Sequence, residues 1–236
     1  MASSKSTKTN GTVAKGKTRW PDHEHELIHT FGVEDYDEYW NAVPMRTRMR
    51  PIHRRMFEEI SKRVKAPGKL LELGPGPGHL FWSLAKDGYE MYACDISQVV
   101  LDNLKAPAER VRLANLNEGI PKFGVRFNVI LSAMVLHHIF KPETFLAELH
   151  DSLETGGYLI LTIPNIVVLR NRLKMMFGKF PHLSPSHRNF MTPQEVKELL
   201  RRARFTVEGF LPARRKPLQM ISPKLFSKEL IVIAHT

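Results

Sequence analysis

The 236-residue sequence contains one cysteine, Cys94, so it can form no internal disulfide bond. Its longest nearly unbroken apolar stretches, Phe127 to Leu136 and Tyr158 to Leu169, are shorter than the roughly 20 residues that a membrane-spanning helix needs. Residues 1–19 lack the apolar core of a secretory signal. The sequence therefore predicts neither a disulfide-stabilised domain nor a spanning helix, and we expect the protein to be cytoplasmic.

Two segments near the N-terminus each carry charged side chains of one sign only. Residues 1–20 carry five basic and no acidic side chains, and residues 21–45 carry seven acidic and no basic ones. Residues 46–69 have nine basic against two acidic side chains, residues 70–169 seven against eleven, and residues 170–236 fourteen against four. Basic flanks around a mildly acidic centre indicate that the flanks face an anionic partner. The alternative is that these basic side chains only form solvated helix faces.

Composition divides the chain into three parts. Residues 1–19 are rich in Ser, Thr and Lys and are expected to form a disordered basic tail. Residues 20–66 combine aromatic residues with apolar positions at helical spacing, which predicts an N-terminal helical cap of short helices broken at Pro44 and Pro51. In residues 67–236, short apolar runs alternate with helical stretches, which is typical of an α/β domain.

Seven apolar runs in this last part have the length of strands buried on both faces. Thr192, Pro193 and Glu195 have the spacing of a capping box, and an expected lid insertion at residues 165–190 precedes them. Together these features predict a doubly wound, Rossmann-like, seven-stranded sheet with flanking helices. The runs are residues 70–73, 91–94, 111–114, 127–131, 158–163, 206–211 and 230–235, and helices are expected at residues 79–86, 98–103 and 143–153, the last ended by Gly156 and Gly157.

The most informative motif is a glycine loop, Glu72 to His79, directly after the first run. Its glycines allow a tight turn and the close approach of a ligand, and Asp95, about twenty residues on, can accept hydrogen bonds from a ribose diol. The spacing G-x-G-x-G differs from the G-x-G-x-x-G of dinucleotide binders. An acidic residue at Glu72 is unfavourable for a phosphate and favourable for a ligand that carries an ammonium group.

At these residues the sequence resembles the class I S-adenosylmethionine-dependent methyltransferases, and the resemblance extends from about Leu70 to His235. Four further segments are similar to family segments: Asn115 to Pro121, Phe127 to Ser132, Val135 to His138 and Gly156 to Ile160. The resemblance implies S-adenosylmethionine as the cofactor. Arg204 departs from it, because a glycine usually ends the last helix at this place.

The resemblance also implies roles for single residues. Glu72 and the loop backbone would hold the methionine part of the cofactor, Asp95 would hold the ribose hydroxyls, and Ile96 would pack on the adenine. Asn115 stands where the family usually has Asp, and an amide oxygen can accept the same hydrogen bond. The cofactor-binding set is completed by Gly74, Pro75, Gly76, Gly78, Leu116 and Ser132, and by Tyr36 or Tyr39 closing over the cofactor, for which helix packing is the alternative.

The acceptor is constrained by what the chain lacks. After the fourth run the residues are Ser132 to Met134, with no Asn-Pro-Pro-Tyr motif for exocyclic base nitrogens, and Cys94 is not placed to attack a pyrimidine. These absences disfavour nucleobase methylation, although other RNA chemistry stays open. We expect a small, anionic or aromatic acceptor with O-methylation favoured, and no metal.

Histidines and arginines are the candidate side chains for contact with the acceptor. His137 and His138 could accept a proton from a hydroxyl, and a structural role is their alternative. The candidate substrate-binding residues are Arg50, His182, His187 and Arg188.

The insertion carries a second pattern. Within residues 166–180, Ile166, Leu169, Leu173 and Phe177 share one helical face, with basic residues between them. One interpretation is a lid helix packed on the core. The other is a basic amphipathic element that touches a membrane surface or a lipid-linked substrate.

Overall fold

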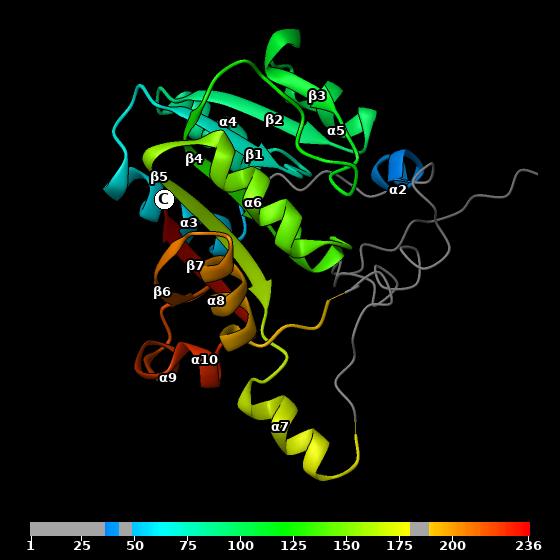
Figure 1. The fold of residues 1–236 in the computed structure, drawn as a ribbon. Helices are drawn as coiled ribbons and strands as arrows, with labels where there is room; N and C mark the ends of the chain where they lie inside the picture. Colours follow the sequence, from blue (N-terminus) through cyan, green and yellow to red (C-terminus); the bar gives the residue numbers. More distant parts are fainter. Residues whose placement is uncertain (1–35, 43–48, 180–188) are drawn as a thin grey trace, which may run out of the picture.

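The computed structural model describes residues 36–42, 49–179 and 189–236, and a seven-stranded sheet forms their centre (Figure 1). The strand order is β3-β2-β1-β4-β5-β7-β6, and β7 runs antiparallel to both of its neighbours while the remaining pairs are parallel. The predicted doubly wound, seven-stranded fold is confirmed. The strands are β1 Lys69–Leu73, β2 Glu90–Asp95, β3 Val111–Leu113, β4 Phe127–Ala133, β5 Leu153–Pro164, β6 Thr206–Pro212 and β7 Glu229–His235.

Helices cover both faces of the sheet. Because successive side chains of a strand point to opposite faces, each strand contributes to two hydrophobic cores. Leu70 packs in one core with apolar residues of α3, α4 and α5, and Leu71 packs in the other with residues of α6 and α8. The covering helices are α3 Pro51–Arg63, α4 His79–Lys86, α5 Gln98–Leu104, α6 Pro142–Ser152 and α8 Pro193–Arg202. The other elements are α2 Tyr36–Ala42, η2 Ala108–Arg110, η3 Leu136–His138, α7 Leu169–Met176, α9 Pro217–Ile221 and α10 Pro223–Phe226.

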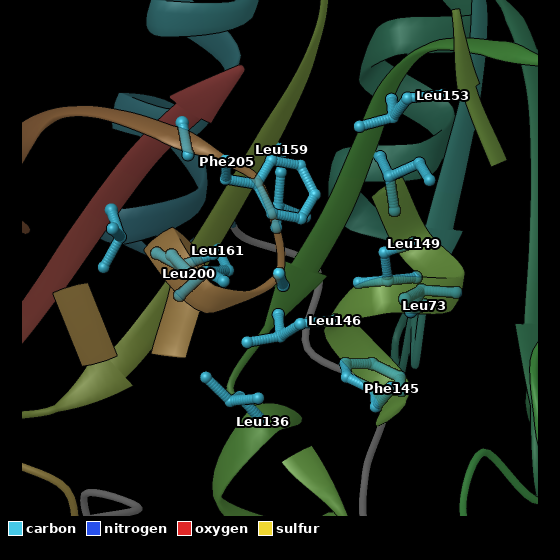
Figure 2. Close-up of a cluster of buried hydrophobic side chains, with 14 of the residues drawn as sticks. Leu73, Leu136, Phe145, Leu146, Leu149, Leu153, Leu159, Leu161, Leu200 and Phe205 are labelled. Atoms are coloured by element: carbon cyan, nitrogen blue, oxygen red, sulfur yellow. The ribbon is translucent and has the colours of Figure 1, made fainter. Parts of the chain in front are cut away.

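The core under α6 and α8 fixes the far half of the sheet (Figure 2). Leu146 and Leu149 of α6 and Leu200 of α8 are fully buried against Leu159 and Leu161 of β5. Burying one such leucine stabilises the fold by roughly 1.5 to 3 kcal/mol. These contacts pack α6 and α8 onto β5.

The capping box at the start of α8 is confirmed. The Thr192 hydroxyl accepts a hydrogen bond from the Glu195 backbone N–H at 3.2 Å, and the Thr192 N–H donates to the Glu195 carboxylate at 2.6 Å. Pro193 occupies the first turn, where a missing N–H costs nothing. The local sequence therefore fixes where this helix begins.

The expectation that Gly156 and Gly157 end a helix at residue 153 is wrong. The helix ends at Ser152, and both glycines lie within β5. A Cβ atom on Gly157 would stand 2.8 Å from the Glu154 carbonyl oxygen and 3.1 Å from that of Phe127. Glycine is required because backbone of β5 itself and of the neighbouring β4 both approach closely there, next to the register shift between β4 and β5.

A helix boundary lies at Pro51, as predicted, because α3 begins there after two non-helical residues, while Pro44 lies outside the described residues. The buried side chains of Ile52, Met56 and Ile60 pack α3 onto the sheet. The tail, residues 1–19, also lies outside the described part, so the tail and the domain boundaries stay predictions.

The insertion forms one helix in its described part, α7, which follows β5. None of the α7 side chains is buried, so this helix is not packed on the core as the first interpretation expected. Leu173 and Phe177 are exposed, whereas Ile166 and Leu169 are half-buried. In the described part of the chain, none of the helices has the length and the apolar composition needed to cross a bilayer.

Candidate functional site

Two buried carboxyl groups meet where β1 and β2 end. Glu72 is 3% exposed and Asp95 is 7% exposed. Burial, and after it the nearby Asp95 charge, raise the pKa of Glu72 to about 8. Burial likewise raises the pKa of Asp95 to about 6, against backbone N–H groups of Ser97, Gly76 and Ile96 that lower it. Such a pair favours a cation or hydroxyl donors beside it.

The Glu72 carboxyl also has an unused acceptor. Its Oε2 atom is buried, and the described residues offer it no hydrogen-bond partner. Leaving a buried oxygen unsatisfied costs about 1 to 3 kcal/mol. A ligand with an ammonium group would satisfy this oxygen, which is the chemistry that the glycine-loop motif predicts.

The loop between β1 and α4 depends on its glycines. Gly74, Gly76 and Gly78 have φ angles of 64°, 51° and 74°, a region that other residues rarely adopt. The Gly74 N–H donates to the Cys94 carbonyl at 2.9 Å, and the Gly78 N–H donates to that of Pro75 at 3.0 Å. A Cβ atom on Gly78 would lie 2.7 Å from Leu104. The loop therefore presents backbone to a ligand.

Helix α2 lies across this loop. The Asp37 carboxylate accepts hydrogen bonds from the Ser97 hydroxyl and from the Val99 N–H, the latter at 3.2 Å. The Trp40 ring lies 3.1 Å from where a Cβ atom of Gly76 would stand. Among the predicted tyrosines, Tyr36 is half-buried on the same helix, and the Tyr39 side chain lies outside what the structure describes.

The residues predicted to border the adenine follow β2 and β3. Ile96 is half-buried beside Asp95, as a residue that packs on a ring should be. The Asn115 side chain donates to Glu118 at 2.9 Å, and its oxygen accepts from the Asn117 N–H at 3.1 Å. That oxygen keeps a second lone pair for a ligand. Leu116 packs against the core and fixes the turn.

The end of β4 carries the predicted serine and histidines. Ser132 is fully buried, and the described residues offer its hydroxyl no partner. The rings of His137 and His138 lie with centroids 4.1 Å apart. His137 is 2% exposed and His138 is half-buried, and the Asn189 N–H donates to the His137 carbonyl at 3.1 Å. Of the two, His138 is the more accessible to an acceptor.

The predicted arginine lies near the carboxyl ends of these strands. The Arg50 guanidinium donates to the Glu229 carboxylate at 2.6 Å, so part of its charge is already paired. Three other predicted acceptor residues, His182, His187 and Arg188, lie outside the described residues.

The sequence analysis missed three residues near the site. His53 on α3 has a buried Nδ1 atom for which the described residues offer no hydrogen-bond partner. Burial, with the charges of Arg50 and His79, lowers the pKa of His53 to about 4, so this imidazole is neutral at pH 7. Asp37 and Asn165 were missed as well. The Asn165 amide anchors β5 to the Lys224 and Ser227 carbonyls at 2.8 Å each. No local motif marks any of the three.

Comparison with known proteins decides the family. A protein-family model described as a methyltransferase domain matches residues 44–208. The chain belongs to this methyltransferase family. The match covers the glycine loop, both carboxyl groups and the two histidines, and with the fold it confirms the resemblance to class I S-adenosylmethionine-dependent methyltransferases.

Relatives and solved structures agree with this family. The ubiquinone biosynthesis O-methyltransferase of Ruegeria pomeroyi is 28% identical over 168 residues, covering 66% of this chain and 65% of that protein. The protein of the same name from Cereibacter sphaeroides is 24% identical over 205 residues, covering 76% and 80%. The chain thus spans just under two thirds of the Ruegeria protein's length.

Among solved structures, the Burkholderia thailandensis 1,6-didemethyltoxoflavin-N1-methyltransferase matches with a TM-score of 0.58 at 20% identity, covering 94% of this chain and 93% of that one. That structure contains bound S-adenosylhomocysteine. An S-adenosylmethionine-dependent methyltransferase from Mesorhizobium loti gives a TM-score of 0.58 at 16% identity, covering 78% and 98%. At these identities the likeness shows a shared fold.

The residues present fit S-adenosylmethionine as the methyl donor. The unsatisfied Glu72 oxygen suits an ammonium group, and the backbone-held Asp95 carboxylate suits a pair of hydroxyls. The glycine loop has no side chains of its own at Gly74, Gly76 and Gly78 that would keep a ligand from its backbone, although Val135 and Trp40 border the Cβ sides of Gly74 and Gly76.

Proposed function

We propose that the protein transfers a methyl group from S-adenosylmethionine to a hydroxyl oxygen of a small, anionic or aromatic acceptor. One observation carries the proposal: the buried Glu72 and Asp95 carboxyl groups lie beside a glycine loop at one edge of the sheet. Two of the relatives carry O-methyltransferase in their names, which supports oxygen as the acceptor atom.

The contacts above support the cofactor-binding roles that the resemblance implies. Glu72 would hold the ammonium group, Asp95 the ribose hydroxyls and Ile96 the adenine, with Asn115, Leu116 and Ser132 on the adjoining rim. When bound, the cofactor supplies a methyl group on a positively charged sulfur. Helix α2 excludes water from the loop, because Asp37 and Trp40 fix it there.

A base near the acceptor would increase the nucleophilicity of its oxygen. His138 is the candidate, because a neutral imidazole can take a hydroxyl proton and this ring is the more accessible of the pair. His137 would act as a positioning residue, since its buried ring lies against that of His138. Transfer itself then depends on alignment of the acceptor oxygen with the methyl carbon.

Arg50 would bind an anionic group of the acceptor in competition with Glu229. His182, His187 and Arg188 stay predicted contributors from the insertion. A nucleic acid acceptor is the second class that the basic flanks leave open, and cytoplasmic location stays a prediction.

The proposal is tested with labelled S-adenosylmethionine and a panel of catechols and phenolic acids. We expect labelled O-methyl product, and we expect His138→Ala to lower kcat about a hundredfold or more while S-adenosylhomocysteine affinity is unchanged. His150→Ala on α6 is the matched control, because His150 lies at the opposite end of that helix from η3. Label in RNA in place of the small acceptors would contradict the acceptor class, and equal kcat for His138→Ala and His150→Ala would contradict the base.

A further inference from the structure

Two short helices expose an unusual amount of apolar surface. Among the described residues eleven large apolar side chains are exposed, and seven of them lie on α7, on Phe177 directly after it, or on α9. Met176, Phe177 and Ile221 are 77%, 78% and 78% exposed. We call this surface the α7–α9 face, and its other exposed apolar members are Leu173, Met175, Leu218 and Met220.

The described chain leaves both parts of the α7–α9 face uncovered. Helix α10 contacts both α7 and α9, so the two helices share one end of the molecule (Figure 1). Neither α7 nor α9 has a buried residue. Exposed apolar patches of this kind on a folded chain mark an interaction surface.

Charge on the α7–α9 face has one sign. Residues 166–179 and 213–228 contain nine basic and no acidic side chains. Eight of these nine are exposed, among them Arg170 within α7 and Lys216 directly before α9. A second copy of the chain would place the two positive faces against each other, and a nucleic acid would leave the aliphatic side chains uncovered. An anionic bilayer satisfies both features, because it accepts apolar side chains below a layer of negative headgroups.

The topology places this face beside the site. β5 and β6 both run antiparallel to β7, so their carboxyl ends lie at one edge of the sheet, and α7 and α9 follow those ends. β1 and β4 are parallel to β5, so Glu72 and His138 lie near the same edge. A surface bound through α7 and α9 would therefore lie next to the site and not behind the sheet.

We propose that the α7–α9 face docks the protein on anionic phospholipid membranes. Apolar side chains of α7 and α9 enter the headgroup boundary while the basic residues meet lipid phosphates. The inference goes beyond the proposed function, since it holds whatever acceptor is methylated.

The test is co-sedimentation of the full chain with phosphatidylcholine vesicles that contain phosphatidylglycerol, and with pure phosphatidylcholine vesicles. We expect binding to the anionic vesicles that weakens as salt is raised, because salt screens the phosphate contacts. The double variant Phe177→Asp/Ile221→Asp should lower the partition coefficient about tenfold or more. Leu113→Asp, which changes an equally apolar exposed side chain on β3, should leave it unchanged.

A second variant keeps the test decisive if the first does not fold. Arg170→Gln/Lys216→Gln leaves the apolar residues in place and should also weaken anionic vesicle binding, whereas Lys141→Gln should not. The proposal is overturned if the wild type does not pellet with anionic vesicles, or if Leu113→Asp lowers binding as much as the double variant. Self-association abolished by Ile221→Asp without any vesicle binding would assign the face to a second copy of the chain, and RNA binding without vesicle binding would assign it to nucleic acid.

Discussion

The Glu72 carboxyl group links the site to the stability of the protein without ligand. Its pKa rises from 4.5 to about 8 because burial and the Asp95 charge disfavour ionisation. The folded state therefore binds more protons than the unfolded state between these values. The contribution of Glu72 to the free energy of unfolding is therefore greatest below pH 4.5, falls as pH rises through this window, and is lost above pH 8.

Replacing the carboxyl group should remove much of this pH dependence. We expect Glu72→Gln to raise the free energy of unfolding at pH 8 by about 1 to 3 kcal/mol and to change it little at pH 4.5, because an amide needs no deprotonation. Urea unfolding at both pH values measures the effect. Glu154→Gln, at an exposed position of β5, is the control, and a wild-type pH slope in Glu72→Gln would show that Glu72 is not the titrating group.

At the scale of single residues, the sequence predicted what one short segment encodes. Glu72, the loop glycines and Asp95 follow directly from strand–loop–helix spacing, and their burial agrees with that pattern. Asp37 and His53 could not be predicted, because each lies on another helix and approaches the site only through tertiary packing. A lone acid and a lone histidine on helices carry no local sign of their neighbours.

At the scale of elements, helix α2 is the part of the site that has the least support from the core. It is held by the hydrogen bonds that Asp37 accepts from Ser97 and Val99 and by Trp40 on the glycine loop. The aromatic residues of the N-terminal cap predicted that this segment closes over the cofactor, but the acceptor of the described hydrogen bonds that anchor it is the Asp37 carboxylate. We therefore predict that this helix acts as a removable cover of the cofactor site.

Removing the Asp37 carboxylate should release this cover without unfolding the sheet. We expect Asp37→Ala to weaken S-adenosylhomocysteine binding about tenfold, the effect of losing two hydrogen bonds to a charged group. The midpoint of thermal unfolding should stay close to that of the wild type. Glu38→Ala is the matched control, because Glu38 is the next residue and is exposed. If both variants bind alike, α2 does not cover the site.

Element boundaries were predictable where one residue type decides them. The α8 cap, the α4 start after Gly78 and the strand positions follow from capping chemistry and apolar runs. Gly157 was misread, because its close approach to Phe127 depends on strand pairing and not on the neighbouring sequence. Helix α7 was read correctly as amphipathic, but the sequence could not tell which surface its apolar side chains face.

At the scale of the whole molecule, the sheet brings remote segments to one edge. β1, β2, β4 and β5 are mutually parallel, so residues that follow them in sequence meet at their carboxyl ends. The two cores fix these strands from both faces, while the cofactor loop, the histidine turn and α7 stay at the rim. The fold thus explains why groups more than sixty residues apart form one site.

Calorimetric titration with S-adenosylhomocysteine tests this account most directly. We predict that the wild type binds it, that Asp95→Ala weakens binding by about 1 to 3 kcal/mol by leaving ribose hydroxyls unpaired, and that Asp102→Ala, an exposed acid on the neighbouring α5, does not. A wild-type protein that does not bind S-adenosylhomocysteine, or an Asp95→Ala variant that binds it as tightly as Asp102→Ala, would contradict the account.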